Sequence, residues 1–321
     1  MKTVISTDRV AAVELLRKGD VVALPTETVY GLAANALNAI AVAKIFEVKE
    51  RPRFDPLIIH LPNREWLEKI AELPTSDRQL ILKLADKFWP GPFTMVLPKG
   101  DIVPDIVTAG LRTVAARLSA HRAFTEIVAE LGEPLAAPSA NRFGRISPTT
   151  AQHVLDELDG RIPLIIDAGA TEHGIESTIV AVRDGRIAVL RRGPITEEQL
   201  SQFAQISSVV TTAKISSPGQ FPSHYAPRTP MRLIDKAEGF VPQKDQRVGL
   251  LAWDGAFRNT QAFAAFRNLS DGGDLREAAA NLFRYLRELD ALSLDLIVAE
   301  RVPSQGLGAA IMDRLERASH R

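Results

Sequence analysis

Three basic side chains stand at alternate positions in the segment 49–56, namely Lys49, Arg51 and Arg53. Pro52 and Pro56 disfavour helical backbone at the residues before them, so we expect an extended segment whose alternate side chains share one face. Cations on one face repel each other unless water or an anion separates them, and arginine can donate two parallel hydrogen bonds to phosphate or carboxylate. The segment therefore indicates a polyphosphate or carboxylate site, with a solvated basic loop as the alternative.

A second candidate is the segment 138–149, which combines small hydroxyl and amide side chains with a glycine. It follows the apolar residues 135–137 and precedes an expected helix, with Ser147 as the predicted N-cap and Pro148 as the first helical residue. Exposed N–H groups and the positive end of a helix dipole suit phosphate binding. A capped connection without a ligand uses the same residue types, so both interpretations stay open.

Two further segments directly follow expected strands. Residues 25–32 come after a strand at 21–24, and residues 167–178 come after a strand at 164–166. Ligands of open α/β sheets bind at the carboxyl ends of strands. In the later segment Glu172 and Glu176 are candidate acid–base groups. The alternatives are a turn whose hydroxyls bind its own backbone and two surface carboxylates.

Several common chemistries are disfavoured because the sequence lacks their motifs. P-loop, dinucleotide-binding, nucleophile-elbow and zincin signatures are absent. The chain has no cysteine, which excludes disulfides, thiolate metal sites and a cysteine nucleophile, and its six histidines show no metal-ligand spacing. We therefore expect no metal site formed by protein side chains.

The composition predicts a globular protein with two domains. The chain has 321 residues, of which 45% are hydrophobic and 24% charged, and 39 basic residues balance 39 acidic ones. Because the net charge is neutral, the composition does not indicate a protein surface that binds nucleic acid generally. We find no apolar signal core and no stretch long enough to span a membrane, so we expect a soluble, cytoplasmic protein.

Short apolar runs alternate with helical periodicity, which is typical of an α/β protein. We expect further strands at 57–61, 93–97 and 113–118, and helices at 39–46, capped by Asn38, and at 76–88. A capping box of Thr196 and Gln199 marks another helix start. Asp184-Gly185 between the apolar runs 179–182 and 187–190 predicts a hairpin, which makes the sheet mixed.

The composition of the sequence changes after residue 205. Residues 206–230 are rich in Ser, Thr, Pro and Gly and show no apolar periodicity, so we predict a linker. Beyond it we expect strands at 231–234, 248–252 and 296–299, and helices at 275–289 and 307–317. We therefore divide the chain into a larger first domain at 1–205, the linker, and a small α/β domain at 231–321.

Taken together and in order, the candidate segments resemble the YrdC family in its long, two-domain form. Residues 217–219 and 224–227 look like the family's linker, and the run 306–318 looks like the close of its appended domain. The matching elements of the first part are LPTETVYGL at 24–32, K-x-R-P at 49–52 with PLIIH at 56–60, WPGPFT at 89–94, VAAR at 114–117, SAN at 139–141 with SPT at 147–149, ESTIV at 176–180 and LR-x-G at 190–193.

The resemblance implies a YrdC-like catalytic domain, with a twisted mixed sheet and helices, and a smaller C-terminal Rossmann-like α/β domain. It implies an L-threonylcarbamoyladenylate synthase, a nucleotidyltransferase that forms threonylcarbamoyl-AMP and pyrophosphate from L-threonine, bicarbonate and ATP. It also implies Mg2+ on the ATP phosphates, and a downstream threonylcarbamoyl transferase that uses the product to modify tRNA. No membrane partner is expected.

Matching positions imply the site residues. Lys49 and Arg51 would be catalytic. ATP would be bound by Lys49, Arg51, Ser139, Asn141, Ser147, Arg191 and Tyr225, where Tyr225 helps the linker to close the cleft. Threonine and the carbamate end would be surrounded by Thr26, His60, Arg117 and Ser177.

The sequence also departs from the family pattern. Which of Arg191 and Arg192 contacts phosphate stays open, because Arg192 replaces a common proline. The other departures are Pro222-Ser223 in place of an aromatic–arginine pair, Ser119 where proline is frequent, and Asp313 where asparagine is common.

Two other functions stay open at this point. One is a non-catalytic RNA-binding protein that uses the same basic segments, against which the neutral net charge weighs. The other is carbamoyl transfer through a carbamoyl-adenylate, as YrdC-like domains perform within larger maturation proteins. The absence of zinc-finger or acylphosphatase-like segments weighs against it. The sequence leaves the oligomeric state, direct tRNA binding and the role of the second domain open.

Overall fold

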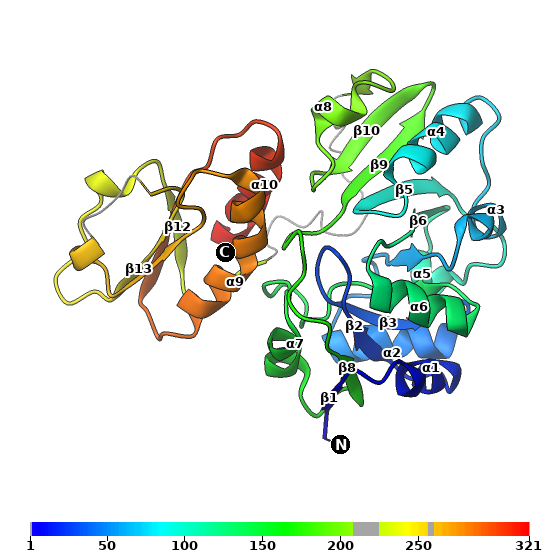
Figure 1. Cartoon of the computed structure of the whole chain (residues 1–321), viewed down its shortest axis with the longest axis horizontal. Helices are drawn as coiled ribbons and strands as arrows, with labels where there is room; N and C mark the ends of the chain where they lie inside the picture. Colours follow the sequence, from blue (N-terminus) through cyan, green and yellow to red (C-terminus); the bar gives the residue numbers. More distant parts are fainter. Residues whose placement is uncertain (1, 208–224, 256–259, 321) are drawn as a thin grey trace. The chain divides into compact units, whose positions relative to one another are not determined.

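The computed structural model describes residues 2–207, 225–255 and 260–320, and its internal contacts divide the chain into two units (Figure 1). The first unit comprises Met1–Phe143, Pro148–Thr171 and Glu176–Gln220. The second comprises Gly144–Ser147, Glu172–Ile175 and Phe221–Arg321. Two short segments that precede the predicted linker, Gly144–Ser147 and Glu172–Ile175, therefore belong to the second unit. The predicted boundaries at 205 and 231 stay predictions, since most of the predicted linker, at 208–224, lies outside the described residues.

The described part of the first unit contains a mixed sheet with the strand order β1-β8-β2-β3-β7-β4-β6-β5-β9-β10-β11. The sheet contains both parallel pairs, such as β4–β6, and antiparallel pairs, such as β5–β6, which confirms the predicted fold class. The strands are β1 (Val4–Ser6), β2 (Val22–Leu24), β3 (Gly31–Asn35), β4 (Ile58–His60), β5 (Phe93–Pro98), β6 (Thr113–Arg117), β7 (Leu135–Ala136), β8 (Leu164–Ile166), β9 (Thr178–Arg183), β10 (Arg186–Arg191) and β11 (Ile206–Ser207). The last of these takes up the first two residues of the predicted linker.

Helices pack on both faces of this sheet (Figure 1). Apolar residues of α1 and α6 pack against one face of β2, β3, β7 and β8, whereas α2, α4 and α7 contribute to a larger core on the other face. Alternate strand residues supply the two cores, as the two-residue period of a strand requires. The helices are α1 (Arg9–Arg17), α2 (Ala39–Lys49), α3 (Leu67–Ile70), α4 (Arg78–Phe88), α5 (Asp105–Thr108), α6 (Arg122–Leu131), α7 (Ala151–Leu158) and α8 (Glu197–Leu200).

Local sequence signals explain several of these boundaries. The side chain of Asn38 accepts hydrogen bonds from the N–H groups of Ile40 and Ala41 and caps α2, as predicted. Thr196 and Gln199 form the predicted capping box of α8. Asp184 and Gly185 both have positive φ angles in the turn between β9 and β10, which is the geometry of a tight hairpin.

One predicted helix start is wrong. The helix after residue 147 does not begin at Pro148 but three residues later, and its N-cap is Thr150, whose side chain accepts from the N–H of His153. The backbone of the preceding residues is already bonded elsewhere: the carbonyl of Pro148 accepts from Tyr30, and that of Thr149 accepts from Thr171. These long-range bonds hold residues 148–149 outside the helix.

The second unit contains, among its described residues, a parallel sheet with the strand order β12-β15-β13-β14 and two long helices. This is the predicted Rossmann-like α/β arrangement. The sequence did not indicate β14, whose residues are all half-buried. The elements are β12 (Met231–Ile234), β13 (Val248–Ala252), β14 (Ala265–Asn268), α9 (Leu275–Asp290), β15 (Leu296–Glu300) and α10 (Leu307–Ser319).

Candidate active site

Three polar side chains lie in line across neighbouring strands of the first unit. The register pairs Arg117, at the end of β6, with His60 of β4 on one side and with Thr94 of β5 on the other. The adjacent residues Ile59, Met95 and Ala116 all point into the main core. Strand alternation therefore turns His60, Thr94 and Arg117 to the opposite face of the sheet.

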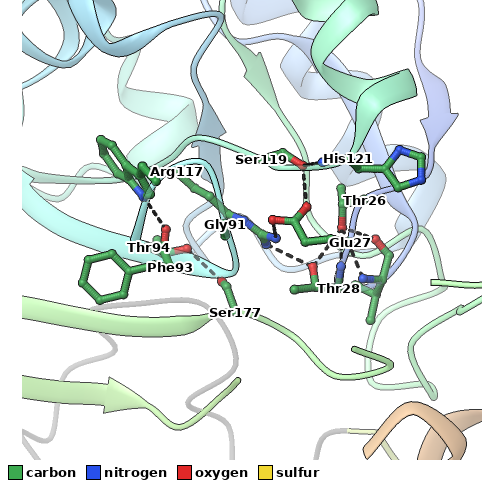
Figure 2. A network of polar contacts seen from close by, with 12 residues as sticks. Thr26, Glu27, Thr28, Gly91, Phe93, Thr94, Arg117, Ser119, His121 and Ser177 are labelled. Atoms are coloured by element: carbon green, nitrogen blue, oxygen red, sulfur yellow. Dashed lines mark hydrogen bonds and ion pairs between the residues drawn. The ribbon is translucent and has the colours of Figure 1, made fainter. Parts of the chain in front are cut away.

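Arg117 is the centre of a buried polar network (Figure 2). Its Nη2 lies 2.7 Å from Oε1 of Glu27, its Nη1 donates to Thr28 Oγ1 at 3.0 Å, and its Nε donates to the carbonyl of Gly91 at 3.2 Å. Both side chains of the ion pair are 4% exposed. Removing one partner of such a buried pair typically costs about 3–5 kcal/mol, so the pair is strongly coupled to the fold of the site.

Glu27 is held as a carboxylate at both oxygens. Burial alone would raise its pKa, but the guanidinium of Arg117 and a hydrogen bond from Ser119 outweigh burial and lower the pKa to about 2. Ser119 Oγ donates to Oε2 at 2.5 Å and itself accepts from the N–H of His121. Glu27 therefore stays ionised over the physiological pH range.

The hydroxyl of Thr26 is oriented by the same network. Thr28 accepts from Arg117, so its own proton can go to Thr26 Oγ1, which lies 2.8 Å away. Thr26 in turn donates to the carbonyl of Val29 at 2.6 Å. In this arrangement Thr26 has no hydroxyl proton left for a ligand, so a contact with substrate would use its methyl group or its backbone.

Ser177 contacts both Arg191 and Thr94, the residue that pairs with Arg117 in the sheet. Its hydroxyl lies 2.8 Å from that of Thr94 and accepts from Nη2 of Arg191 at 3.0 Å, while Nε of Arg191 donates to the Ser177 carbonyl. A side chain at Gly193 would overlap the backbone of residues 176–178, with the nearest atom at 2.4 Å. Glycine at this position therefore lets the chain after β10 lie against the segment that carries Ser177.

His60 is buried as a neutral imidazole. Burial, reinforced by the charge of Arg117, lowers its pKa to about 3. Its ring packs against Phe124 with ring centres 4.8 Å apart, and its Nδ1 has no hydrogen-bond partner among the described residues. The structure thus brings His60, Thr26, Arg117 and Ser177, the residues predicted to surround threonine, into one connected region of the first unit.

Lys49 lies at the end of α2, which corrects the expected extended geometry. Glu50 adopts a left-handed conformation with φ 54°, and the N–H of Arg51 bonds back to the carbonyl of Phe46. Lys49 and Arg51 are therefore buried at a helix end, whereas Arg53 is exposed. The prediction that all three cations share one face is wrong, because the helix continues past Phe46 and closes with a C-cap.

The ammonium of Lys49 is bound by backbone carbonyls. Nζ donates to the carbonyl of Ser139 at 2.6 Å and to that of Asn141. Burial, followed by the nearby charge of Arg51, lowers the pKa of Lys49 well below its ordinary value. Ser139 and Asn141, which are predicted to bind ATP, contact Lys49 through their carbonyls, and the amide of Asn141 donates to the carbonyl of Arg142.

Arg51 lies in a second buried ion pair. Its Nη2 is 2.8 Å from Oδ2 of Asp55 and donates to the carbonyl of Pro56, while its Nε donates to the carbonyl of Asp55. Burial raises the pKa of Asp55, against the opposite effect of Arg51, Lys49 and Arg191. The charges of these three predicted ATP-binding residues therefore all favour the ionised form of the Asp55 carboxylate. Arg192, the alternative to Arg191, is exposed and pairs with Glu197 at 2.7 Å.

Two predicted ATP-binding residues, Ser147 and Tyr225, belong to the second unit. Within that unit Arg287 of α9 donates to the carbonyls of Ile146 and Ser147. Tyr225 is buried, has a φ of 64°, and packs against Phe283. Its ring also lies 5.3 Å from the guanidinium carbon of Arg314, which is a cation–π distance.

The sequence did not assign roles to several residues of these networks. Glu27 and Thr94 were part of recognised motifs, and Ser119 was noted only as a departure from proline. The signal that could have found Glu27 and Asp55 is a carboxylate inside an otherwise apolar segment, since such a group needs a buried partner. Of the candidate acid–base groups, Glu176 is buried and Glu172 is exposed.

The described residues contain no group of three or more His, Cys, Asp or Glu side chains that could hold a metal ion. Searched over the same residues, no helix is long and apolar enough to cross a membrane. The buried carboxylates Glu27 and Asp55 each face an arginine.

Comparison with known proteins identifies the family. A family model described as "Telomere recombination" (Sua5_yciO_yrdC) matches residues 14–193, and one described as "Threonylcarbamoyl-AMP synthase, C-terminal domain" matches residues 195–320. The chain belongs to the threonylcarbamoyl-AMP synthase family. The recognition of a long, two-domain YrdC-type chain from its sequence is thereby confirmed.

Relatives and a solved structure match almost the whole chain. Threonylcarbamoyl-AMP synthase of Pyrococcus abyssi is 39% identical over 97% of this chain and 93% of the relative, and that of Bacillus subtilis is 40% identical over 96% and 92%. The crystal structure of P. abyssi Sua5 complexed with L-threonine covers 99% of this chain and 97% of its own, at 36% identity and a TM-score of 0.86.

Proposed function

We propose that the protein is an L-threonylcarbamoyladenylate synthase, which forms threonylcarbamoyl-AMP and pyrophosphate from L-threonine, bicarbonate and ATP. The observation that carries this proposal is the match of both family models, with relatives of that name similar over nearly the full length. The L-threonine complex of the P. abyssi relative supports threonine as the amino acid. The product would serve the threonylcarbamoyl modification of tRNA adenosine through a downstream transferase in the cytoplasm.

The reaction requires no covalent enzyme intermediate. The amine of threonine adds to bicarbonate or CO2 to give a carbamate, with loss of water in the case of bicarbonate. A carbamate oxygen then attacks the α-phosphorus of Mg2+-bound ATP, the bond to the bridging oxygen breaks, and pyrophosphate leaves. The protein contributes position and charge stabilisation, the two largest sources of rate in such transfers.

The two buried networks of the first unit suit the two substrates. We assign Lys49, Arg51 and Arg191 to the phosphates, because all three act on the buried carboxylate of Asp55 and so lie near one another. Ser139 and Asn141, whose carbonyls bind Lys49, would add to the nucleotide site. Ser147 and Tyr225 are assigned to ATP from the family resemblance alone. Thr26, His60, Arg117 and Ser177 would hold threonine and the carbamate.

His60 fits its place beside the amino acid for a chemical reason. An imidazole with a pKa of about 3 is neutral at pH 7, so it can accept or donate a hydrogen bond without repelling the ammonium form of threonine. Its buried Nδ1 is the atom that a threonine hydroxyl or amine would satisfy.

The test is release of pyrophosphate from ATP by the purified protein with Mg2+, with bicarbonate and threonine omitted in turn. The proposal expects release that requires both, together with a new adenylate on chromatography. Release that is indifferent to threonine, or that requires carbamoyl phosphate instead, would reject it in favour of carbamoyl transfer. No turnover, with RNA affinity that falls steeply with salt, would favour RNA binding.

A further inference from the structure

The guanidinium of Arg117 is held by contacts of all three nitrogens within the first unit. Nε donates to the carbonyl of Gly91, Nη1 donates to Thr28, and Nη2 forms the ion pair with Glu27. A guanidinium carries five N–H donors, so one donor on each terminal nitrogen is left over by the contacts that described residues make. Two such donors form a fork of the kind that binds a carboxylate bidentately.

The charge of the site favours a carboxylate over a polyphosphate. Arg117 and Glu27 together carry no net charge, and both are 4% exposed. A polyphosphate carries several negative charges that a neutral pair does not balance, whereas one carboxylate needs little beyond well-placed donors. The arrangement of donors at Arg117 therefore matters more for binding than its charge.

We infer that Glu27, locked by the hydroxyl of Ser119, is a positioning residue that aims Arg117 at the carboxylate of the amino-acid substrate (Figure 2). Ser119 reaches Glu27 Oε2, so the carboxylate cannot rotate away while its other oxygen holds Arg117. Thr28 fixes the second terminal nitrogen. The inference rests on the proposed function for the identity of the substrate, and adds two residues that do not touch it.

If Glu27 only stabilised the fold, its replacement would affect all substrates alike. The test therefore compares threonine with its uncharged amide and with ATP. Wild type is compared with Glu27→Gln and Glu27→Ala in KM and kcat for L-threonine, L-threoninamide and ATP. In Glu27→Ala we expect the KM for threonine to rise at least about tenfold, as for loss of a charge-assisted contact, with the KM for ATP within about twofold. The preference for threonine over its uncharged amide should fall to a similar extent.

Glu27→Gln should lie between wild type and Glu27→Ala, because its amide oxygen still accepts from Arg117 and only the charge is lost. Ser119→Ala should raise the KM for threonine about two- to fivefold, as for one lost hydrogen bond. If Glu27→Ala does not fold, these two variants decide the question. The matched control is Glu300→Gln, a carboxylate of the second unit that is 2% exposed and accepts from the N–H groups of Ala237 and Trp253.

The outcomes separate this inference from the proposed function. If wild type forms no threonine-dependent adenylate, the proposed function fails, and titration calorimetry with threonine alone then tests the role of Glu27 in binding. If wild type is active but the Glu27 and Ser119 variants keep the KM for threonine and the preference over threoninamide, the inference is overturned. It is also overturned if Glu300→Gln changes the substrate preference to the same extent.

Discussion

The buried cations Lys49 and Arg117 are stabilised in different ways in the first unit. Arg117 lies 2.7 Å from a carboxylate, Glu27, whereas the ammonium of Lys49 is bound by the neutral carbonyls of Ser139 and Asn141. A cation that is already paired is fixed in place and adds little net charge. The ammonium of Lys49 donates to carbonyl oxygens rather than to a carboxylate, and burial lowers its pKa.

This contrast explains how two regions beside the same sheet can each favour a different anionic substrate. The region of Lys49 and Arg51 can gain most from a multiply charged phosphate. The region of Arg117 can gain most from a single carboxylate that fits its fixed donors. The following predictions test that division, from the largest expected effect to the smallest.

Replacement of Lys49 should have the largest effect. Lys49→Met keeps the apolar stem but removes the charge, and we expect kcat/KM for ATP to fall about 10²–10³-fold, as for loss of a transition-state donor. The KM for threonine should change far less. Lys44→Met on the same helix is the matched control, since Lys44 is partly exposed and pairs with Asp20. Equal losses in the two variants would remove Lys49 from the site.

Arg51→Ala should lower turnover at least about tenfold, because charge-stabilising donors are typically worth more than about 1.4 kcal/mol. Arg53→Ala should remain close to wild type, since Arg53 is exposed while Arg51 is buried against Asp55. Steady-state kcat of both variants checks this. Near-wild-type turnover in Arg51→Ala would refute the role of Arg51, and equal losses would favour the basic face predicted from sequence alternation.

The pH dependence of ATP binding should reveal the lowered pKa of Lys49. Phosphate binds the protonated ammonium, so the KM for ATP should rise with pH above the pKa of Lys49 in the free protein, by up to about tenfold per pH unit. The rise should begin below the ordinary lysine value of 10.5, because burial lowers that pKa. The KM for threonine, measured in parallel, should lack this rise. A constant KM for ATP up to pH 10 would contradict the account.

His60 should make the protein less stable in acid. Its pKa is about 3 in the folded protein and near 6.5 when unfolded, so the unfolded state takes up the proton first as pH falls. The free energy of unfolding should therefore decrease from pH 6.5 to 5.5 by up to about 1.4 kcal/mol on account of this residue. Denaturant unfolding of His60→Gln should show a smaller decrease, and the exposed His320→Gln should not.

Much of the fold could be predicted because its signals are local. The cap at Asn38, the capping box at Thr196 and the Asp184-Gly185 turn each depend on residues a few positions apart. The missed strands β3 and β14 are short or rich in small residues, and they exist because neighbouring strands pair with them. The start of α7 was misplaced for the same reason, since bonds from Tyr30 and Thr171 hold the residues before it.

In the candidate site, too, the sequence indicated residues but not their long-range contacts. The sequence brought forward Lys49, Arg51 and Arg117 as cations, but it could not show that Lys49 ends a helix or that Arg53 points into solvent. Nor could it pair Glu27 with Arg117, because these residues meet only through the register of the sheet and the loop after β2. The pairing of charges, which decides what each cation can bind, is a property of tertiary structure.

The most direct test of the account follows the carbon of bicarbonate. The protein is incubated with ATP, Mg2+, L-threonine and ¹³C-bicarbonate, and the product is identified by mass spectrometry. The account predicts one compound that contains threonine, AMP and a single labelled carbon, formed together with pyrophosphate. An adenylate that lacks either the label or threonine, or no adenylate at all, would contradict it.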